Sequence, residues 1–251
     1  MTDPELAGVL DWWDANARPL PWRATRDVYA VWVSEVMSAQ TTVNRAARAW
    51  LAWMERWPTV EALAGTSLAE VLGQWQGLGY PRRARDLHRS ARVVAASGWP
   101  DDLQTLPGVG PYIAAAIRCF AREEAVLPTD VNVARVLRRR FPAGVDIAAD
   151  PWRTGQALME FGQRVCTARP RCGECPVRAG CPGPEQRDRK AGVPRRQKPF
   201  EGSARQRRGR LLRRVLAEGS VAVPDDEREI AAGLAADGLA VLSRGRLSPP
   251  Q

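Results

Sequence analysis

The chain has 251 residues, a formal net charge of +9 and 45% hydrophobic residues. This length and composition allow a packed core in one or two domains. No apolar stretch approaches the roughly 20 residues that cross a bilayer, so we expect no membrane segment. The basic balance predicts a polyanionic partner.

Helical periodicity dominates the first 165 residues. Apolar side chains recur at the three- and four-residue spacing of amphipathic helices, and Gly and Pro residues mark the breaks between them. We expect helices over 4–16, 27–40, 43–56, 67–75, 81–96, 111–121, 132–140 and 152–165. No convincing alternating run interrupts them, so this part of the chain is predicted to be all-α.

A basic segment separates this region from a short C-terminal unit. Residues 187–214 hold twelve Arg or Lys and two acidic residues, a local charge of +10, which leaves −1 for the rest of the chain. We interpret 186–209 as a linker that also lies along a phosphate backbone, because flexibility does not prevent counterion release. Helices over 210–217 and 224–237, followed by a β-wing over 240–247, predict a winged-helix-like unit at 210–251.

Four of the five cysteines, Cys166, Cys172, Cys175 and Cys181, lie within sixteen residues. Their spacing, with no histidine nearby, favours four thiolates around a [4Fe-4S] cluster or a zinc ion. Two disulfides are the alternative, which the lack of a secretory signal in the first twenty residues disfavours. We therefore expect a cytoplasmic protein, with Cys119 as a small buried side chain.

A glycine turn at 106–110 and an aspartate twenty residues later are the next candidates. The turn, Leu-Pro-Gly-Val-Gly, lies between two predicted helices, and the N–H groups at the start of the second can hold a phosphate oxygen. Taken alone, the turn also fits a simple helix connection. Asp130 precedes the predicted helix 132–140, where a carboxylate usually acts as a cap.

Several motifs in one order resemble the helix-hairpin-helix DNA glycosylases of the endonuclease III superfamily, and within it the adenine DNA glycosylases of the MutY family. The resemblance covers residues 1 to about 185. It rests on Leu-Pro-Trp-Arg at 20–23, Val-Trp-Val-Ser-Glu-Val-Met at 31–37, Gln-Thr at 40–41, Gly-Leu-Gly-Tyr at 77–80, Arg-Arg-Ala-Arg at 82–85, the stretch 106–112, Asp-Val-Asn-Val at 130–133, Arg-Val-Leu at 135–137 and the cysteine loop. It implies a two-lobed all-α glycosylase domain at 1–185 with a [4Fe-4S] loop at 166–181.

The resemblance assigns Glu35 as the general acid that protonates the departing adenine, and Asp130 as the carboxylate that stabilises the positive sugar. Such chemistry needs a neutral proton donor beside an ionised group. Asn132 is expected to orient Asp130 or the attacking water. Tyr112 stands where the bifunctional branch has a Schiff-base lysine, so we expect base removal without strand cleavage. On residue type alone, Glu35 also fits a buried structural acid and Tyr112 a packing residue.

The other assigned residues serve the DNA, which is expected to be a mispair-containing duplex bound by a monomer at the bacterial nucleoid. Trp22, Arg23 and Gln156 are expected to line the pocket of the extruded base. Gln40 and Tyr80 are expected to enter the duplex, and Gly108 and Gly110 to contact phosphate.

Three departures from the family pattern stand out. Five residues, not six, separate the first two cluster cysteines. Ser38 and Ala39 replace Leu-Gln, and Val131 replaces glycine, which leaves mispair selectivity open. Residues 187–251 are too short for the Nudix-like domain that reads 8-oxoguanine, so recognition of that lesion is expected to be weaker or to rest on the catalytic domain.

The predicted function is a monofunctional adenine DNA glycosylase acting on A:8-oxoguanine or A:G mispairs. A thymine or uracil mismatch glycosylase is the nearest alternative, and the changes at Ser38 and Ala39 keep it open. A non-catalytic iron-sulfur DNA-binding protein is the alternative from another class. The presence of both Glu35 and Asp130 argues against it.

Overall fold

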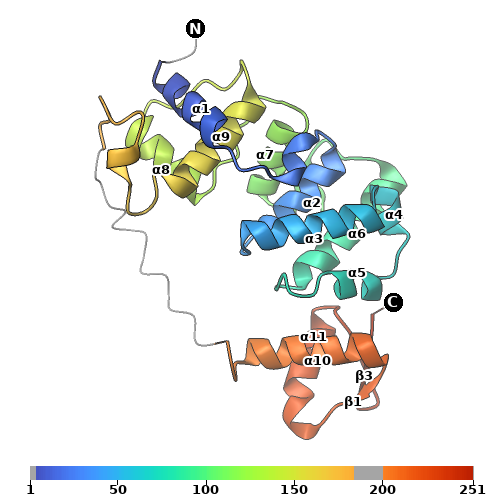
Figure 1. The fold of residues 1–251 in the computed structure, drawn as a ribbon. Coiled ribbons are helices and arrows are strands. Elements are labelled where there is room, and N and C mark those ends of the chain that lie inside the picture. The colour runs from blue at the N-terminus through green and yellow to red at the C-terminus, as the bar shows by residue number, and fades with distance from the viewer. Residues whose placement is uncertain (1–3, 184–199, 251) are drawn as a thin grey trace. The chain divides into compact units, whose positions relative to one another are not determined.

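The computed structural model describes residues 4–183 and 200–250. These ranges are mostly helical, and the sheet that they contain has three short strands (Figure 1). The chain divides into two compact units, Met1–Glu35 with Val109–Pro194 and Val36–Gly108 with Arg195–Gln251. Each unit is therefore built from two stretches that are far apart in sequence.

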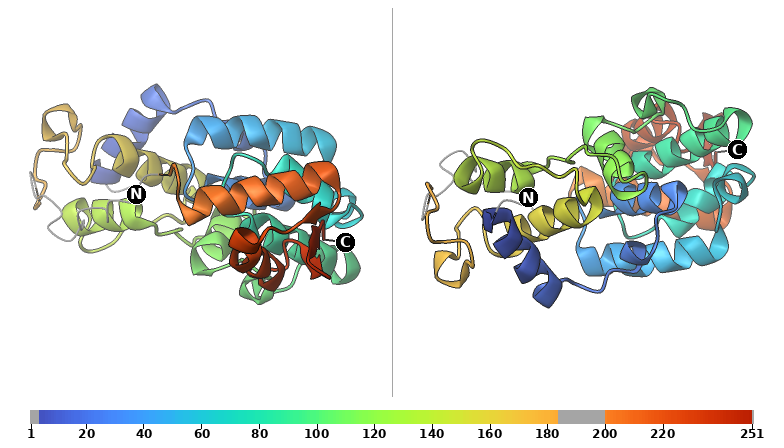
Figure 2. Two further views of the ribbon diagram at one scale, coloured as in Figure 1. Left: turned by 90° about the horizontal axis from the view of Figure 1, so that it is seen from below. Right: turned by 90° about the horizontal axis from the view of Figure 1, so that it is seen from above.

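The first unit is organised around helix α9, which packs against α1, α7 and α8. Figure 2 shows α9 between α1 and α8. The elements of this unit are α1 (Pro4–Asn16), η1 (Pro21–Ala24), most of α2 (Val28–Ser38), α7 (Pro111–Phe120), α8 (Val131–Arg140), α9 (Pro151–Arg164) and η3 (Cys172–Glu174).

Apolar faces of α1, α8 and α9 form the core of this unit, and Val9, Val133 and Leu158 are fully buried in it. Gly162 allows the closest approach between α8 and α9, because a Cβ there would lie 2.8 Å from the carbonyl oxygen of Asn132. The start of α8 is thereby held directly against α9.

The N-terminal stretch of the second unit packs α4 and α5 against α6. Its elements are α3 (Val43–Arg56), α4 (Val60–Ala64), α5 (Leu68–Gln74), α6 (Arg82–Ser97) and η2 (Leu103–Thr105). Trp53 is fully buried and meets the rings of Trp57 and Trp75 edge-on. Trp50 is buried as well, so these aromatic side chains form part of the core.

The C-terminal stretch forms two helices and a small antiparallel sheet in the order β1-β3-β2. Its elements are α10 (Ala204–Glu218), β1 (Val221–Ala222), η4 (Asp225–Glu227), α11 (Arg228–Ala236), β2 (Val241–Ser243) and β3 (Arg246–Ser248). Leu247 is fully buried and pairs with both Val221 and Leu242. The predicted sequence of helix, helix and wing is present.

Helix α10 begins six residues before the predicted start at 210. The hydroxyl of Ser203 accepts a hydrogen bond from the backbone N–H of Gln206 and so caps the helix. Four arginines of the basic segment 187–214 form ion pairs in this unit. Arg207, which pairs with Asp226, and Arg208, which pairs with Asp237, come from the predicted linker, and Arg210 and Arg214, which both pair with Glu227, follow it. Residues 186–199 of the predicted linker lie outside the described residues.

All eight helices predicted before residue 166 are present, with ends that differ by at most two residues. Helix α4 and strand β1 were missed because five and two residues are too few to establish a period. In the described part of the chain, no helix is long and apolar enough to cross a membrane.

Candidate active site and cysteine loop

Glu35 lies on α2, whose neighbouring residues are almost all apolar or small, and its side chain is partly buried. Burial is the largest influence on this carboxyl and raises its pKa from 4.5 to about 7. A hydrogen bond from Tyr112 lowers the pKa, and the charge of Asp130 raises it further. A carboxyl with this pKa is partly protonated at neutral pH, so it can deliver a proton.

Tyr112 lies in the first turn of α7, directly after Gly110 and Pro111. Burial, followed by the charges of Glu35 and Asp130, raises the pKa of Tyr112 above its usual range, so the phenol stays protonated. Its hydroxyl hydrogen-bonds Glu35 and also lies 3.8 Å from the sulfur of Met159. Three predicted residues from three segments are thereby brought together in the first unit.

Asp130 caps helix α8 and is held firmly by that role. Its Oδ1 accepts hydrogen bonds from the backbone N–H groups of Asn132 and Val133, both at 2.8 Å, and its Oδ2 accepts one from the Asn132 side chain at 2.6 Å. The first residue of α8, Val131, is 75% exposed. The valine that stands here in place of the family's glycine therefore lies largely in solvent.

A chain of hydrogen bonds continues from Asn132 into the unit. Arg135 is buried and donates to the side-chain oxygen of Asn132 at 2.7 Å, to the carbonyl of Gly162 at 2.9 Å and to the carbonyl of Cys166 at 2.7 Å. Asn132, which hydrogen-bonds Asp130, is thus itself bonded by Arg135, and Arg135 also binds the start of the cysteine loop.

The three predicted base-pocket residues lie in the same unit. Trp22 is buried in η1, and the next residue, Arg23, donates through Nε to the side-chain oxygen of Gln156 at 2.9 Å. Arg23 also donates through Nη1 to the carbonyl of Arg18 at 2.8 Å. Arg23 is thereby bonded to Gln156, and its guanidinium carbon also lies 5.5 Å from the centre of the Trp13 ring.

Glu160 organises this group and was not singled out from the sequence. It is 1% exposed and pairs with Arg18 at 2.7 Å, Arg23 at 2.6 Å and Arg164 at 3.2 Å. Burial alone would raise the pKa of Glu160, but the hydrogen bond and charge of Arg23, with the charge and hydrogen bond of Arg18, lower it overall. Glu160 follows Gln156 by four residues and so lies on the same face of α9, and this spacing was the sequence feature that could have indicated its place beside the predicted base pocket.

The remaining predicted DNA contacts fall mostly in the second unit. Gln40 and Tyr80 are both exposed, and each has a positive φ, 55° and 47°. Gly108 also has a positive φ, 78°, and a Cβ there would lie 2.9 Å from the Cβ of Asp86. Gly110, in the first unit, has an ordinary φ of −89° and open space around it, so its backbone conformation does not demand glycine.

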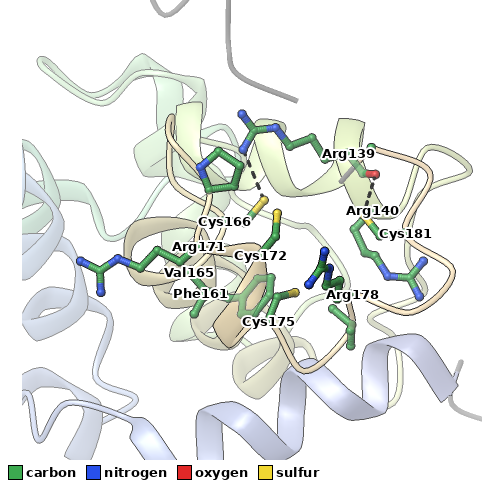
Figure 3. Close-up of a pocket in the computed structure, with 13 residues that line it drawn as sticks. Arg139, Arg140, Phe161, Val165, Cys166, Arg171, Cys172, Cys175, Arg178 and Cys181 are labelled. Atoms are coloured by element: carbon green, nitrogen blue, oxygen red, sulfur yellow. Dashed lines mark hydrogen bonds between the residues drawn. The ribbon is translucent and has the colours of Figure 1, made fainter. Parts of the chain in front are cut away.

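The four clustered cysteines line one pocket at the end of α9, together with Arg139, Arg140, Arg171 and Arg178 (Figure 3). Arg139 donates to the sulfur of Cys166 at 3.6 Å, and the thiol of Cys181 donates to the carbonyl of Arg139 at 3.5 Å. None of the five cysteines, all of which lie in the described residues, forms a disulfide, and Cys119 is buried as predicted.

Burial raises the pKa of the Cys175 thiol, a backbone N–H group lowers it, and the three neighbouring thiols raise it again. The four sulfur atoms are therefore close enough to influence one another. In residues 4–183 and 200–250, no group of three or more His, Cys, Asp or Glu side chains is arranged to hold a metal ion. The donor set is nonetheless the right one for a thiolate-bound group, since four thiols and four arginines line the pocket and no carboxylate competes.

Residues 33–160 match the profile of the HhH-GPD superfamily base excision DNA repair proteins. The chain belongs to this superfamily. The expectation of a helix-hairpin-helix glycosylase fold is confirmed, and the matched stretch contains Glu35, Tyr112 and Asp130.

Individual relatives show which branch of the HhH-GPD superfamily this chain resembles. The adenine DNA glycosylase of Mycolicibacterium smegmatis is 43% identical over 81% of this chain and 78% of its own length. The human adenine DNA glycosylase is 41% identical over 69% of this chain but only 38% of its own length. The resemblance to adenine DNA glycosylases is therefore confirmed over most of the chain.

Among solved structures, a thermostable thymine-DNA glycosylase aligns with a TM-score of 0.63, covering 70% of this chain and 93% of its own. Its sequence is 24% identical, so the likeness supports the HhH-GPD fold and does not bear on which base this chain removes.

Proposed function

We propose that this chain is a monofunctional adenine DNA glycosylase that removes adenine paired with 8-oxoguanine or guanine and leaves an abasic site. The observation that carries the proposal is the joint position of Glu35, Tyr112 and Asp130, with the pKa of Glu35 raised to about 7. Two carboxyl groups in different environments are what acid-assisted cleavage of a glycosidic bond requires.

Glu35 acts as the proton donor. Its proton moves to a ring nitrogen of the extruded adenine, the C1′–N9 bond breaks, and the bonding electrons leave with the neutral base. Tyr112 stays protonated and donates its hydrogen bond to Glu35, which fixes the direction of that carboxyl. No lysine is present at position 112, so the sugar is not attacked by the protein and the strand is not cut.

Asp130 faces the positive charge that develops on the sugar. Three hydrogen bonds from Asn132 and Val133 fix its two oxygens, so the carboxylate does not have to reorganise as the charge appears. Water then adds to C1′ of the cationic sugar and gives up one proton, which the Glu35 carboxylate can take back. Asn132 positions Asp130 for this role.

Trp22, Arg23 and Gln156 recognise the extruded base. A planar base needs an apolar wall and a few hydrogen bonds at its edge, and a buried indole beside an arginine and an amide supplies both. Glu160 neutralises the buried Arg23 and so holds its guanidinium at this edge.

We further propose that the cysteine loop holds a [4Fe-4S] cluster through Cys166, Cys172, Cys175 and Cys181. Four thiols that line one pocket, with arginines to balance the charge of bound thiolates, support this assignment over mixed-ligand sites. With such a cluster bound, the loop would be held in one conformation, and its exposed arginines could contact phosphate. Iron and sulfide analysis separates it from zinc, which leaves the protein colourless.

The proposed substrate is mispaired double-stranded DNA, bound by a monomer at the bacterial nucleoid. Light scattering of the free protein and of its complex with a short duplex measures the stoichiometry. A dimer in either state would contradict the monomer.

A duplex panel tests the proposed activity. Duplexes carrying A:8-oxoguanine, A:G, T:G and U:G are incubated with the protein and then treated with alkali, which converts an abasic site into a strand break. We expect breaks at adenine in the first two duplexes and none without alkali. Release confined to thymine or uracil would overturn the proposal, and cleavage without alkali would contradict the monofunctional assignment.

A further inference from the structure

Gln40 and Tyr80 share an unusual backbone conformation. Among the described residues, four that are not glycine have a positive φ, and these are two of them. Side chains other than glycine resist this region, so it persists only where surrounding contacts enforce it. Both residues end exposed turns of the second unit, one after α2 and one before α6.

One side chain supplies those contacts in both turns. Arg83 donates through Nη1 to the carbonyls of Val36 at 2.5 Å and Ala39 at 2.6 Å. Through Nη2 it donates to the carbonyls of Leu78 at 2.9 Å and Gly79 at 3.2 Å. The guanidinium therefore joins two turns that are about forty residues apart in sequence.

Two of the four bonded carbonyls directly precede the two residues with positive φ. The Ala39 carbonyl belongs to the peptide that precedes Gln40, and the Gly79 carbonyl belongs to the peptide that precedes Tyr80. The backbone N–H of Arg83 also donates to the carbonyl of Tyr80 at 2.9 Å, so both peptides around that residue are held.

Two rings complete this arrangement. The Arg83 guanidinium carbon lies 5.2 Å from the centre of the Trp75 ring and 5.7 Å from that of Tyr80. The indole N–H of Trp75 donates to the Gly79 carbonyl at 3.0 Å. The guanidinium is partly buried between these groups, which favours a single orientation.

Lysine cannot replace this set of contacts. Its ammonium is one point with three donors, whereas the planar guanidinium directs donors from separate nitrogens to carbonyls on two sides. A lysine at 83 would retain the charge and lose the connection between the turns.

We propose that Arg83 is a positioning residue that holds Gln40 and Tyr80 together as one wedge for base extrusion. This rests on the proposed function, in which those two side chains enter the duplex. Arg83 acts on extrusion through them and takes no part in breaking the glycosidic bond.

The test measures extrusion separately from chemistry. A duplex with 2-aminopurine opposite 8-oxoguanine reports unstacking by fluorescence, and single-turnover assays on A:8-oxoguanine report excision. We expect Arg83→Lys to reduce the extrusion equilibrium about tenfold or more, since misplacement of a positioning contact by 1 Å costs up to about a hundredfold. Excision should fall by the same factor and keep its pH dependence.

Arg82→Lys is the matched control, because Arg82 is the exposed neighbour on α6 and the variant keeps its charge. It should leave extrusion unchanged. Thermal melting of Arg83→Lys shows whether the variant stays folded, so that loss of the wedge is not confused with unfolding. A second test introduces Arg83→Lys into a Gln40→Ala/Tyr80→Ala protein and measures extrusion again. Once the wedge side chains are absent, Arg83→Lys should have almost no further effect on extrusion.

Normal extrusion by Arg83→Lys, or an undiminished further loss in the Gln40→Ala/Tyr80→Ala background, would overturn the role of Arg83. Extrusion by the unaltered protein without release of adenine would contradict the proposed function and would still allow the Arg83 comparison. If the unaltered protein extruded no base, the wedge itself would be refuted, and the inference about Arg83 with it.

Discussion

Glu35 illustrates how a residue acquires a chemical property from its surroundings. An exposed glutamate is ionised at neutral pH, whereas burial and Asp130 keep Glu35 partly protonated, with a pKa of about 7. Tyr112 opposes this shift by donating a hydrogen bond to the charged form. The balance leaves a proton available near neutral pH.

The first prediction concerns the rate of excision. Because the acid form of Glu35 is required, excision by the unaltered protein should fall as pH rises through about 7. Glu35→Gln should lose about 10²- to 10⁴-fold in single-turnover rate and lose this pH dependence. Rapid-quench assays on A:8-oxoguanine across the range measure both. A Glu35→Gln variant with the unaltered rate would refute the assigned acid.

The second prediction concerns stability. The pKa of Glu35 is 4.5 unperturbed and about 7 when folded, so between these values the folded chain binds more protons than the unfolded chain. The free energy of unfolding therefore falls as pH rises through this window. Above it, the buried carboxylate costs up to about 3 kcal/mol.

Glu35→Gln removes that cost, so the variant should be more stable than the unaltered protein at pH 8 by about 1–3 kcal/mol. The difference should shrink at pH 5, where both side chains are largely neutral. Urea unfolding at the two pH values measures it. An equal difference at both would show that packing, and not ionisation, separates the two proteins.

At the scale of elements, helix α8 and its cap serve structure and the site together. Asp130 satisfies the first N–H groups of α8, while Arg135 on the same helix bonds Asn132 and the carbonyl of Cys166. The contacts of Asp130 would be the same if it were only a helix cap or if it also stabilised a cationic sugar. Substitution separates them.

The third prediction compares two variants of that cap. Asn caps a helix about as well as Asp, so Asp130→Asn should keep the stability and melting temperature of the unaltered protein. Asp130→Ala removes the cap and should lower the free energy of unfolding by about 1 kcal/mol. Both should lose about 10²- to 10³-fold in excision rate, because each removes the charge that faces the sugar. Thermal melting and single-turnover assays are compared. Asp130→Asn with unaltered activity would leave Asp130 as a structural cap.

At the scale of the whole molecule, the cysteine loop is a long segment with little regular structure of its own. One short turn, η3, interrupts residues 165–183. Arg139 of α8 binds the loop through the carbonyls of Thr167 and Ala168 and the sulfur of Cys166. A bound group with four thiolate ligands would supply the remaining cross-links.

The fourth prediction removes one ligand. Cys181→Ser should lower the iron content and the melting temperature, because metal-ligand bonds contribute directly to folding free energy. Cys119→Ala is the control, since Cys119 is buried, does not line the pocket of the four clustered cysteines and bonds the carbonyl of Pro151. It should keep its iron. Stoichiometric zinc in the unaltered protein would replace the iron-sulfur assignment with the four-thiolate zinc site.

Much of this protein follows from the sequence by itself. Helix positions before residue 166 were predictable because amphipathic periodicity repeats within each segment. The ordered motifs identify the superfamily and point to Glu35, Tyr112 and Asp130, whose catalytic roles are predictions. Short elements such as α4 and β1 carried too few residues to give a signal.

Only the tertiary structure decided the properties that depend on segments distant in sequence. The raised pKa of Glu35, the three arginines around Glu160, the ion pairs that engage the arginines of α10, and the contacts of Arg83 with two turns all join residues whose proximity no local pattern encodes. Burial and Coulomb interactions depend on distance in space, and that distance is set when the whole chain folds.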